Sequence, residues 1–366
     1  MQNNKTRICC AIPTLITGGM ERVMSILMNG FVNYPNAEIH LLLYGKKATI
    51  FYDLDKRVII HRPNFSFNDS CRSLSTLRSM LFLRKTFKKI KPDAVLSFGE
   101  YFNSFVLLSA IGLRVPIYVS DRSSPNLQMG GMHRWLRKIL YPHAAGVIAQ
   151  THTAKEIYSK IYTPNSIIVI GNPIRHISRI KKVEQSNTII SVGRLIKTKH
   201  YDRLIRLFNQ IGRMDWTLLI VGGDAQKQNQ MVELESLLEE LGRPKNIILA
   251  GNRSDVDELL LESRIFVFTS SSEGFPNAIG EALSAGLPVV AYDCVAGPSD
   301  MVHNGENGYL IPLFDDDTFI QKLEYLMNNP EERGRMGRKS LEYALEYSEE
   351  TICKLYYQFI TQKNEH

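Results

Sequence analysis

Short apolar runs alternate along the whole chain with longer stretches in which apolar residues recur every three or four positions. Continuous apolar strands separated by helices are typical of parallel sheets that helices cover on both faces. The alternation therefore predicts an α/β protein built of doubly wound sheets. The expected strands are 7–12, 39–43, 94–97, 117–120, 146–149, 167–170, 188–192, 217–221, 246–249, 265–269 and 288–291.

The length of 366 residues is too great for one compact core and suits two domains of about 180 residues each. The polar, weakly periodic stretch 175–187 is the expected linker. We therefore expect an N-terminal domain at 1–180 and a C-terminal domain at 181–345. The last segment, 346–366, is expected to be a helix that packs back toward the N-terminal domain.

Charge is distributed unevenly between the two halves. Residues 1–180 hold 24 Lys and Arg against 9 Asp and Glu, whereas the remaining residues hold 20 basic and 28 acidic side chains. This asymmetry suggests different partners for the two domains. Five scattered cysteines without metal-ligand spacing favour a reducing compartment. No secretory leader or membrane-spanning run is recognised, so we expect a cytoplasmic protein.

Three loops after expected strands carry unusual residues. The first, 12–22, contains Gly18 and Gly19 before a helix, where paired glycines allow close approach to a ligand; a plain tight turn remains possible. The second, 191–200, contains Arg194 and Lys199, whose charges suit a diphosphate, although solvated surface cations are the alternative.

The third loop is the most specific. It places Glu273 before a Gly-Phe-Pro-Asn turn at 274–277, and Glu281 follows one turn into the next helix. Backbone N–H groups of such a turn can bind sugar or phosphate oxygens, and a carboxylate at 281 suits a pair of ribose hydroxyls. Two unrelated surface glutamates are the alternative.

Segment 273–281 resembles the Glu-x7-Glu signature of the family-four retaining glycosyltransferases, which adopt the GT-B fold of two facing Rossmann-like domains. Similar supporting segments span nearly the whole chain, most specifically 188–312. They are 18–22, 192–194, 221–224, 285–291 and 307–311.

The resemblance implies a role for each matched residue. Arg194 and Lys199 would hold the donor diphosphate and offset charge on the departing nucleotide, and Glu273 would contact the sugar; these are the expected catalytic residues. Glu281 would bind the ribose. The donor-binding residues implied by the resemblance are Gly18, Gly19, Asn252, Arg253, Gly274, Phe275, Pro276, Asn277, Ala278 and Glu281.

One loop departs from the family pattern. Many members have Glu-His after the strand at 117–120, whereas this chain has Asp121 and Arg122. A histidine role therefore cannot be carried over, and the two residues are expected near the acceptor or the cleft. A related Glu-Arg version in relatives that build bacterial surface polysaccharides favours that branch.

No cofactor and no metal ion are expected. The two cations would replace the metal that other sugar transferases hold with an Asp-x-Asp motif. The Asp-Leu-Asp at 53–55 is interpreted as surface, and the acidic run 315–317 as a helix start. No His, Cys and carboxylate cluster has metal-ligand spacing.

Two segments of the first half combine basic and apolar residues. Segment 72–91 has seven Arg or Lys and no acid, and segment 132–140 adds a second cluster. Basic amphipathic helices can lie on an anionic membrane surface, although core-facing apolar residues with solvated cations would give the same pattern. A lipid-diphosphate acceptor would also suit these cations; nucleic acid is the rival partner, but no recognised binding module is present.

The sequence thus predicts a retaining, metal-independent hexosyltransferase that moves a sugar, from a UDP-sugar by preference, to a lipid-linked or surface glycan such as O-antigen or capsule. It is expected to act at the inner face of the cytoplasmic membrane. A sugar-nucleotide epimerase of GT-B-like fold and a non-catalytic membrane or glycan-binding module are the alternatives.

Overall fold

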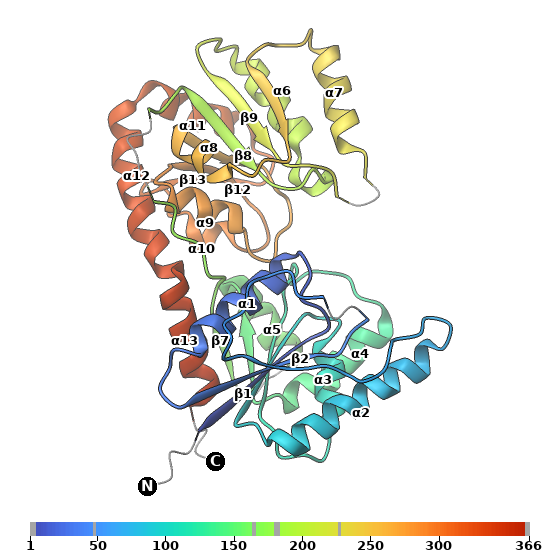
Figure 1. The fold of residues 1–366 in the computed structure, drawn as a ribbon. Helices are drawn as coiled ribbons and strands as arrows, with labels where there is room; N and C mark the ends of the chain where they lie inside the picture. Colours follow the sequence, from blue (N-terminus) through green and yellow to red (C-terminus); the bar gives the residue numbers. More distant parts are fainter. Residues whose placement is uncertain (1–4, 47–48, 163–165, 179–183, 226–227, 363–366) are drawn as a thin grey trace. The chain divides into compact units, whose positions relative to one another are not determined.

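The computed structural model describes residues 5–46, 49–162, 166–178, 184–225 and 228–362. The chain divides into two units: unit 1 is Met1–Pro173 together with Glu349–His366, and unit 2 is Ile174–Ser348. In each unit a parallel sheet lies between two layers of helices (Figure 1). Along the sequence, unit 2 is therefore an insertion into unit 1.

The sheet of unit 1 has the strand order β3-β2-β1-β4-β5-β6-β7, and neighbouring strands are parallel. Its strands are β1 Thr6–Ile12, β2 Ala37–Leu43, β3 Ile59–His61, β4 Ala94–Phe98, β5 Ile117–Ser120, β6 Gly146–Ala149 and β7 Ile167–Val169. Its helices are α1 Gly19–Phe31, α2 Arg72–Ile90, α3 Asn103–Ser109, α4 Gly131–Leu140, α5 His152–Tyr162 and α13 Glu349–Thr361, with a 3₁₀ turn η1 at Tyr141–His143.

Burial on both faces explains why the strands of unit 1 are continuously apolar. In β1, Ile8 to Ile12 are all inaccessible to solvent. One face carries α2, α3, α4 and α5, whose apolar side chains form a core with alternate residues of β1, β4, β5 and β6. The other face carries α1 and α13, which lie side by side (Figure 1).

Helix α13 belongs to unit 1 although it follows unit 2 in the chain. Its Ile352, Cys353, Tyr356 and Ile360 are buried. The contact with α1 is close, because a β-carbon on Gly30 would stand 2.5 Å from Cys353 Sγ. The helix therefore contributes directly to the core of this unit.

The sheet of unit 2 has the order β10-β9-β8-β11-β12-β13 and is likewise parallel. Its strands are β8 Thr188–Val192, β9 Thr217–Val221, β10 Ile247–Gly251, β11 Ile265–Phe268, β12 Val289–Asp293 and β13 Gly308–Pro312. Its helices are α6 Tyr201–Ile211, α7 Gln230–Glu240, α8 Val256–Glu262, α9 Asn277–Ser284, α10 Pro298–Met301, α11 Asp316–Asn328 and α12 Pro330–Ala344, with 3₁₀ turns η2 Lys197–Lys199 and η3 Leu345–Tyr347.

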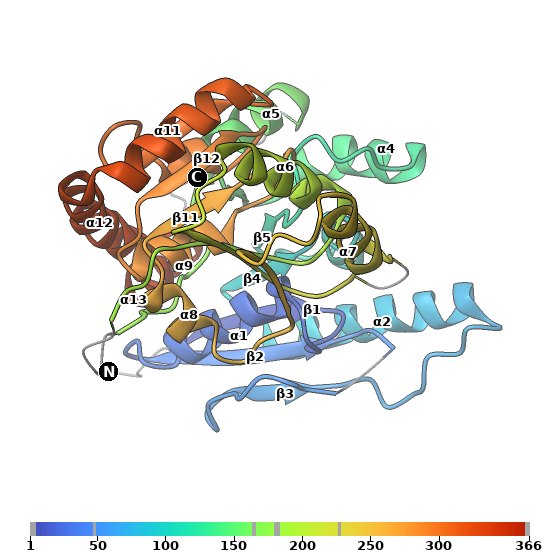
Figure 2. The same cartoon turned by 90° about the horizontal axis from the view of Figure 1, so that it is seen from above.

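The helices of unit 2 also divide between the two faces of its sheet. Helices α6, α7 and α11 share one core with β8, β9 and β11, and Figure 2 shows α6 beside α7. Helices α8, α9 and α10 share the other core, and α12 packs on α9. One apolar core packs on each face of the sheet, so the loops at the carboxyl edge of the sheet start from firmly packed strands.

The boundary between the units falls before the expected linker. Ile174 and Ile177 are buried in the core of unit 2 together with Ile279 and Met301, which explains why unit 2 begins at Ile174 and not near residue 181. Residues 179–183 of the expected linker lie outside the described residues. The second boundary falls between Ser348 and Glu349, close to the expected residue 345.

The expected strands are confirmed within one or two residues at each end. Two edge strands, β13 and β3, are absent from the expected strands. Strand β13 buries only Gly308 and Ile311. Strand β3 has only three residues and exposes Ile59 and Ile60. Without a buried face, such a strand has no periodic apolar signal. The helix start expected at the acidic run 315–317 is confirmed, since the Asp315 carboxylate accepts a hydrogen bond from Thr318 N at 3.2 Å.

Candidate active site

The carboxyl ends of the parallel strands of unit 2 meet at one edge of its sheet. The strand order reverses between β8 and β11, because β9 and β10 follow on one side of β8 while β12 and β13 follow on the other. At such a point the two neighbouring loops diverge and leave a crevice that ligands use. The loops after β8 and β11 contain most of the residues that the sequence singled out.

Lys199 and Glu273 meet at this point. Lys199 Nζ lies 2.7 Å from Glu273 Oε1, and each side chain is only 14% exposed. The ammonium group also lies 4.7 Å from the centre of the Phe268 ring. A cation held by a carboxylate and an aromatic face has little freedom to move, so its charge is fixed at the edge of the sheet.

Hydrogen bonds join the two loops that carry this ion pair. Ser271 N donates to Thr198 O at 2.8 Å, and Thr269 Oγ1 donates to Lys199 O at 2.8 Å. His200 Nε2 and Ser271 Oγ are also 2.8 Å apart. The backbone around Lys199 is therefore positioned by the β11 loop as well as by its own strand.

The glycines after β9 allow its loop to lie against the β8 loop. Gly222 has φ 149°, and a β-carbon there would stand 1.8 Å from Gly193 O. The neighbouring Gly223 has the side chain of Asn252 directly over it, since a β-carbon would stand 2.4 Å from Asn252 Nδ2. Gly222 is required by its backbone conformation and by this backbone contact. Gly223 leaves room for the Asn252 side chain, which therefore lies beside the same loops.

Arg194 lies in the β8 loop and points into solvent. It makes no hydrogen bond or ion pair with any residue in the described part of the chain. Arg253, by contrast, pairs with Asp255, whose pKa is lowered mainly by this hydrogen bond. Of the two arginines, Arg194 is the one whose guanidinium is uncommitted.

The Glu-x7-Glu segment spans the loop after β11 and the start of α9. Phe275 and Pro276 of the turn 274–277 are buried, and the Phe275 ring lies 5.7 Å from that of Tyr347. Gly297, with φ 104°, lets the β12 loop approach Pro276, because a β-carbon there would stand 2.2 Å from Pro276 Cδ. Asn277 and Ala278 then begin α9. The turn is therefore a rigid element of unit 2.

Glu281 lies on the second turn of α9 and is 8% exposed. Arg175 approaches it with Nη1 at 3.6 Å from Oε1 and also forms an ion pair with Asp257. Arg175 belongs to the expected linker 175–187, and no role was expected for it. No sequence signal marks it, since the contact joins residues more than one hundred positions apart.

Gly18 and Gly19 lie in unit 1, at the start of α1. Tyr52 holds the loop in place, because its hydroxyl accepts from Gly18 N at 3.0 Å and donates to Gly18 O at 2.8 Å. A β-carbon on Gly18 would stand 2.2 Å from Glu21 Oε2, whereas nothing lies within 4 Å of the corresponding position on Gly19. Gly18 thus makes room for the Glu21 carboxylate.

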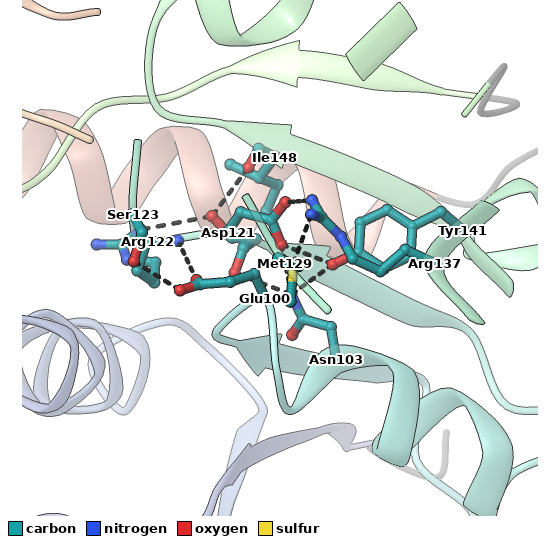
Figure 3. Close-up of polar contacts among 10 residues, drawn as sticks. Glu100, Asn103, Asp121, Arg122, Ser123, Met129, Arg137, Tyr141 and Ile148 are labelled. Carbon is teal, nitrogen blue, oxygen red and sulfur yellow. Dashed lines mark hydrogen bonds and ion pairs between the residues drawn. The ribbon is translucent and has the colours of Figure 1, made fainter. Parts of the chain in front are cut away.

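Asp121 is the centre of a buried polar network in unit 1 (Figure 3). Its carboxylate forms an ion pair with Arg137 and accepts hydrogen bonds from Tyr141 Oη at 2.6 Å and Asn103 Nδ2 at 3.1 Å. The side chains of Asp121 and Arg137 are 2% and 7% exposed. Burial raises the pKa of Asp121, and the neighbouring Arg137 charge partly offsets this effect. Each of these partners is a side chain of unit 1.

Arg122 is also bound within unit 1. Its guanidinium donates to Tyr356 Oη at 3.2 Å and to Asn172, and it lies 4.3 Å from the centre of the Phe98 ring. Its backbone N–H donates to Glu100 at 3.3 Å (Figure 3). In this structure the loop residues 121 and 122 therefore support the fold of unit 1, and their expected place near the acceptor stays a prediction.

In the Asp-Leu-Asp motif at 53–55, Asp55 binds Arg57, two residues further along the chain. The Arg57 guanidinium and backbone N–H bind Asp55 and lower its pKa to about 2. Among the described residues, no group of three or more His, Cys, Asp and Glu side chains is arranged to hold a metal ion. In the same part of the chain, no helix is long and apolar enough to cross a membrane.

Two sequence models of known families match this chain. The model described as "Glycosyl transferases group 1" matches residues 174–342, and the one described as "Glycosyltransferase Family 4" matches residues 17–176. The chain belongs to the family-four glycosyltransferases. The two matched segments meet at the boundary between the two units.

Relatives of similar length support the assignment of this glycosyltransferase. An uncharacterised glycosyltransferase of Haemophilus influenzae is 26% identical over 92% of the chain and 94% of its own length. A Campylobacter jejuni α-1,4-N-acetylgalactosaminyltransferase is 24% identical over 88% of the chain and 89% of its own length, and its name specifies a diphospho-undecaprenol-linked glycan. Relatives thus include enzymes of bacterial glycan synthesis.

Solved structures match the whole glycosyltransferase and show its fold. The crystal structure of Anabaena HepE in complex with UDP has a TM-score of 0.78 and 17% identity, covering 97% of this chain and 98% of HepE. The two parallel-sheet units are those of the GT-B fold, as the resemblance implied.

Proposed function

We propose that this glycosyltransferase moves a sugar from a UDP-sugar to a lipid-diphosphate-linked glycan, with retention of anomeric configuration and without a metal ion. The observation that carries the donor part is the ion pair of Lys199 and Glu273 at the switch point of the unit 2 sheet. The UDP complex of HepE supports the choice of nucleotide, and the name of the C. jejuni relative supports a lipid-linked acceptor.

The donor diphosphate is assigned to Lys199 and Arg194. Lys199 offers a fixed ammonium group, and Arg194 offers an uncommitted planar fork, which is the geometry that phosphate oxygens accept in pairs. Glu281, at the inner end of the same segment, accepts from the ribose hydroxyls. Glu273 both holds Lys199 and accepts from a sugar hydroxyl. The glycines of the β9 loop keep side chains out of this space.

In the proposed reaction the bond between the anomeric carbon and the donor phosphate oxygen breaks. A bond from the acceptor oxygen to the same carbon forms on the same face, and the acceptor proton moves to the departing diphosphate. No protein base is required in this step. The enzyme contributes orientation and fixed positive charge where negative charge develops, which is the role of Lys199 and Arg194.

Direct UDP binding tests the donor site. In isothermal titration calorimetry, Lys199→Ala is expected to weaken UDP binding roughly 10- to 100-fold, since one charge-assisted contact to phosphate is lost. Lys197→Ala is the matched control, because Lys197 lies in the same 3₁₀ turn with an exposed side chain. Equal UDP affinities of the wild type and Lys199→Ala would remove Lys199 from the site.

Two further measurements test the finer parts of this proposal. Transfer in the presence of EDTA is expected to equal transfer without it, since the two cations supply the charge. The product formed from an α-linked donor is expected to show the anomeric coupling constant of an α-glycoside in proton NMR. Loss of transfer in EDTA, or a β-glycoside product, would contradict the metal-independent retaining mechanism.

We also propose that this glycosyltransferase binds an anionic membrane surface through two helices of unit 1. On the outward face of α2, Leu74, Leu77 and Leu81 are each about half exposed, and Lys85 and Lys88 continue the same face. Helical spacing places these leucines together, while buried Ser75, Ser79 and Leu83 face the protein. An exposed apolar ridge that continues into lysines suits the boundary between lipid tails and anionic head groups.

Helix α4 presents a second stripe of the same kind. Met132, Trp135 and Ile139 lie at i, i+3 and i+7 and are 72%, 61% and 43% exposed. Lys138 is exposed beside them. Arg137, which the sequence analysis counted in this basic cluster, instead points inward to Asp121. The stripe is therefore more apolar and less basic than the sequence indicated.

Vesicle sedimentation tests the membrane contact. Replacing Lys85, Lys88 and Lys89 with Gln is expected to weaken binding to phosphatidylserine-containing vesicles about a hundredfold, at about 1 kcal/mol per cation. The matched control replaces three exposed lysines elsewhere in unit 1 with Gln, at 56, 155 and 160. If both triple variants bind equally, α2 does not contact the membrane.

A further inference from the structure

A cavity of about 700 Å³ lies at the amino edge of the unit 2 sheet. Arg264 and Pro288 line it, and they stand directly before β11 and β12. Lys199 and Glu273 follow β8 and β11, so they lie at the opposite, carboxyl edge of the same parallel sheet. The cavity is therefore separate from the residues assigned to the donor, and its volume falls in the range of small-molecule sites, about 300–1,000 Å³.

Three arginines line the cavity, and no Asp or Glu of the described residues joins them; they are Arg264, Arg333 and Arg338. None of the three forms an ion pair within the part of the chain that the structure describes. Acidic side chains outnumber basic ones by 28 to 20 in residues 181–366. Three positive charges without a carboxylate are thus unusual in this half of the chain, and they favour a negatively charged ligand.

Neutral groups hold two of these arginines in place. The Arg264 guanidinium donates to the Asn187 side chain and to Gln185 O. Arg333 Nη1 donates to two backbone carbonyls in the last turn of α11. Burial, and then the neighbouring Arg264 charge, lower the pKa of Arg333. The two like charges therefore repel each other, and a bound anion would offset this repulsion.

Donor groups remain free on all three side chains. Arg264 Nε and Arg333 Nε and Nη2 make no hydrogen bond with a described residue. Arg338 is exposed on α12 and makes none with any residue that the structure describes. Planar guanidinium groups with free N–H donors are the partners that phosphate oxygens accept in pairs.

The rest of the lining includes apolar side chains, among them Ile177, Leu261 and Leu341. An inorganic phosphate ion would contact the arginines and leave this apolar surface in water. The organic part of a phosphate ester would cover it, and each Å² of apolar surface removed from water stabilises the complex by about 25 cal/mol. The lining therefore favours an ester over the free ion.

We propose that this cavity binds a phosphate ester, with the phosphate group against Arg264, Arg333 and Arg338 and the organic part against the apolar residues of the lining. The inference goes beyond the proposed function, because the ligand is neither the donor nor the acceptor. Ala285 and Gly286, which follow α9, also line the cavity. The ligand would thus contact the ends of both elements that carry the Glu-x7-Glu segment, β11 and α9.

Isothermal titration calorimetry on the full chain tests the site. The probes are phenyl phosphate, glucose 6-phosphate and inorganic phosphate. At least one ester is expected to bind the wild type with a Kd below about 1 mM and more tightly than inorganic phosphate. Arg338→Gln is expected to weaken that binding roughly three- to tenfold and Arg264→Gln at least about tenfold, since each removes a charge-assisted contact. Arg338 makes no contact that the fold needs, so its replacement leaves the protein folded.

Two control variants are expected to bind the ester as the wild type does. Arg335→Gln removes a charge from the same helix as Arg338, but Arg335 pairs with Glu332 and does not line the cavity. Lys199→Ala removes a cation at the other edge of the sheet. Loss of ester binding in Lys199→Ala, with normal binding in Arg338→Gln, would move the ester to the donor site and overturn the inference.

Dihexanoyl phosphatidic acid, titrated below its micelle concentration, identifies the source of the phosphate group. If it binds in a way that Arg338→Gln weakens while both soluble esters fail, the ligand is a lipid head group. If none of these esters binds the wild type, or if the one that binds does so equally to Arg264→Gln and Arg338→Gln, the inference is wrong. UDP binding by Arg338→Gln is expected to equal that of the wild type, so the donor proposal stands or falls separately.

Discussion

Replacing Asp121 tests whether this carboxylate holds unit 1 together. Its removal would leave the Arg137 guanidinium buried, with the rings of Tyr141, Tyr158 and Tyr162 around it at 5.0, 5.9 and 4.8 Å. Arg137 Nε already lacks a partner among the described residues. The rings offer cation–π attraction but no counter-charge. Asp121→Ala should therefore expose the full cost of burying an arginine alone.

The expected magnitude follows from the burial of both partners. Breaking a buried ion pair by removing one member costs about 3–5 kcal/mol. For a domain of this size each 1 kcal/mol lowers the melting temperature by roughly 2–4 °C, so Asp121→Ala is expected to melt about 10 °C below the wild type. Replacing both members, as in Asp121→Leu with Arg137→Met, removes the uncompensated charge and is expected to recover most of this loss.

Thermal unfolding and urea titration of the wild type, both variants and Arg134→Met measure these differences. Arg134 lies on the same helix as Arg137 but is exposed, so its replacement controls for the loss of a charge. Asp121→Ala that is as stable as the wild type but inactive would refute the structural reasoning and place Asp121 in the reaction. A double variant no more stable than Asp121→Ala would refute the ion-pair magnitude.

Three further predictions concern other parts of the chain. Burial lowers the pKa of His40 and of His61, whose ring nitrogens lie 3.0 Å apart. The folded protein therefore favours the neutral imidazoles. The stability that depends on these neutral forms is present above about pH 6.5 and is lost as pH falls below it. The melting temperature should drop between pH 7.5 and 5.5, and His61→Gln should make this drop smaller; an unchanged drop would contradict the assignment. Gly222→Ala should destabilise unit 2 by at least about 1–3 kcal/mol through backbone strain alone. It should also abolish UDP binding, because the new β-carbon would displace Gly193 O. A melting curve equal to that of the wild type would contradict this prediction. Glu281→Gln keeps the size of the side chain but removes its charge, so calorimetry should show UDP binding weakened by roughly tenfold with an unchanged melting temperature, and equal affinity would exclude a ribose contact.

The positions of most strands along the chain were predictable because they depend on local pattern. Fully buried strands such as β4 and β11 must be continuously apolar, and the sequence shows this directly. The edge strand β3 has no such pattern, and its pairing depends on β2 alone. That Lys199 and Glu273 lie at the carboxyl edge of the sheet was predictable because both residues follow expected strands. Those strands, β8 and β11, are neighbours, and the roles of the two residues stay predictions.

The partners of charged residues were not predictable. Arg137 stands between Arg134 and Lys138 in the sequence, and nothing local distinguishes it from these exposed cations. It points inward because Asp121, at the end of β5, forms an ion pair with it. Arg175 meets Glu281 because the chain enters unit 2 beside α9. Such contacts depend on how distant segments pack, and neither helical spacing nor composition carries that information.

The place of α13 in unit 1 has a consequence for biosynthesis. A ribosome releases all of unit 2 before it releases the helix that covers one face of the first sheet. Unit 2 can therefore reach its native state while unit 1 still exposes the apolar surface that Ile352, Tyr356 and Ile360 later cover. A nascent chain stopped at Ser348 should hold a protease-resistant second unit and a first unit that chaperones recognise.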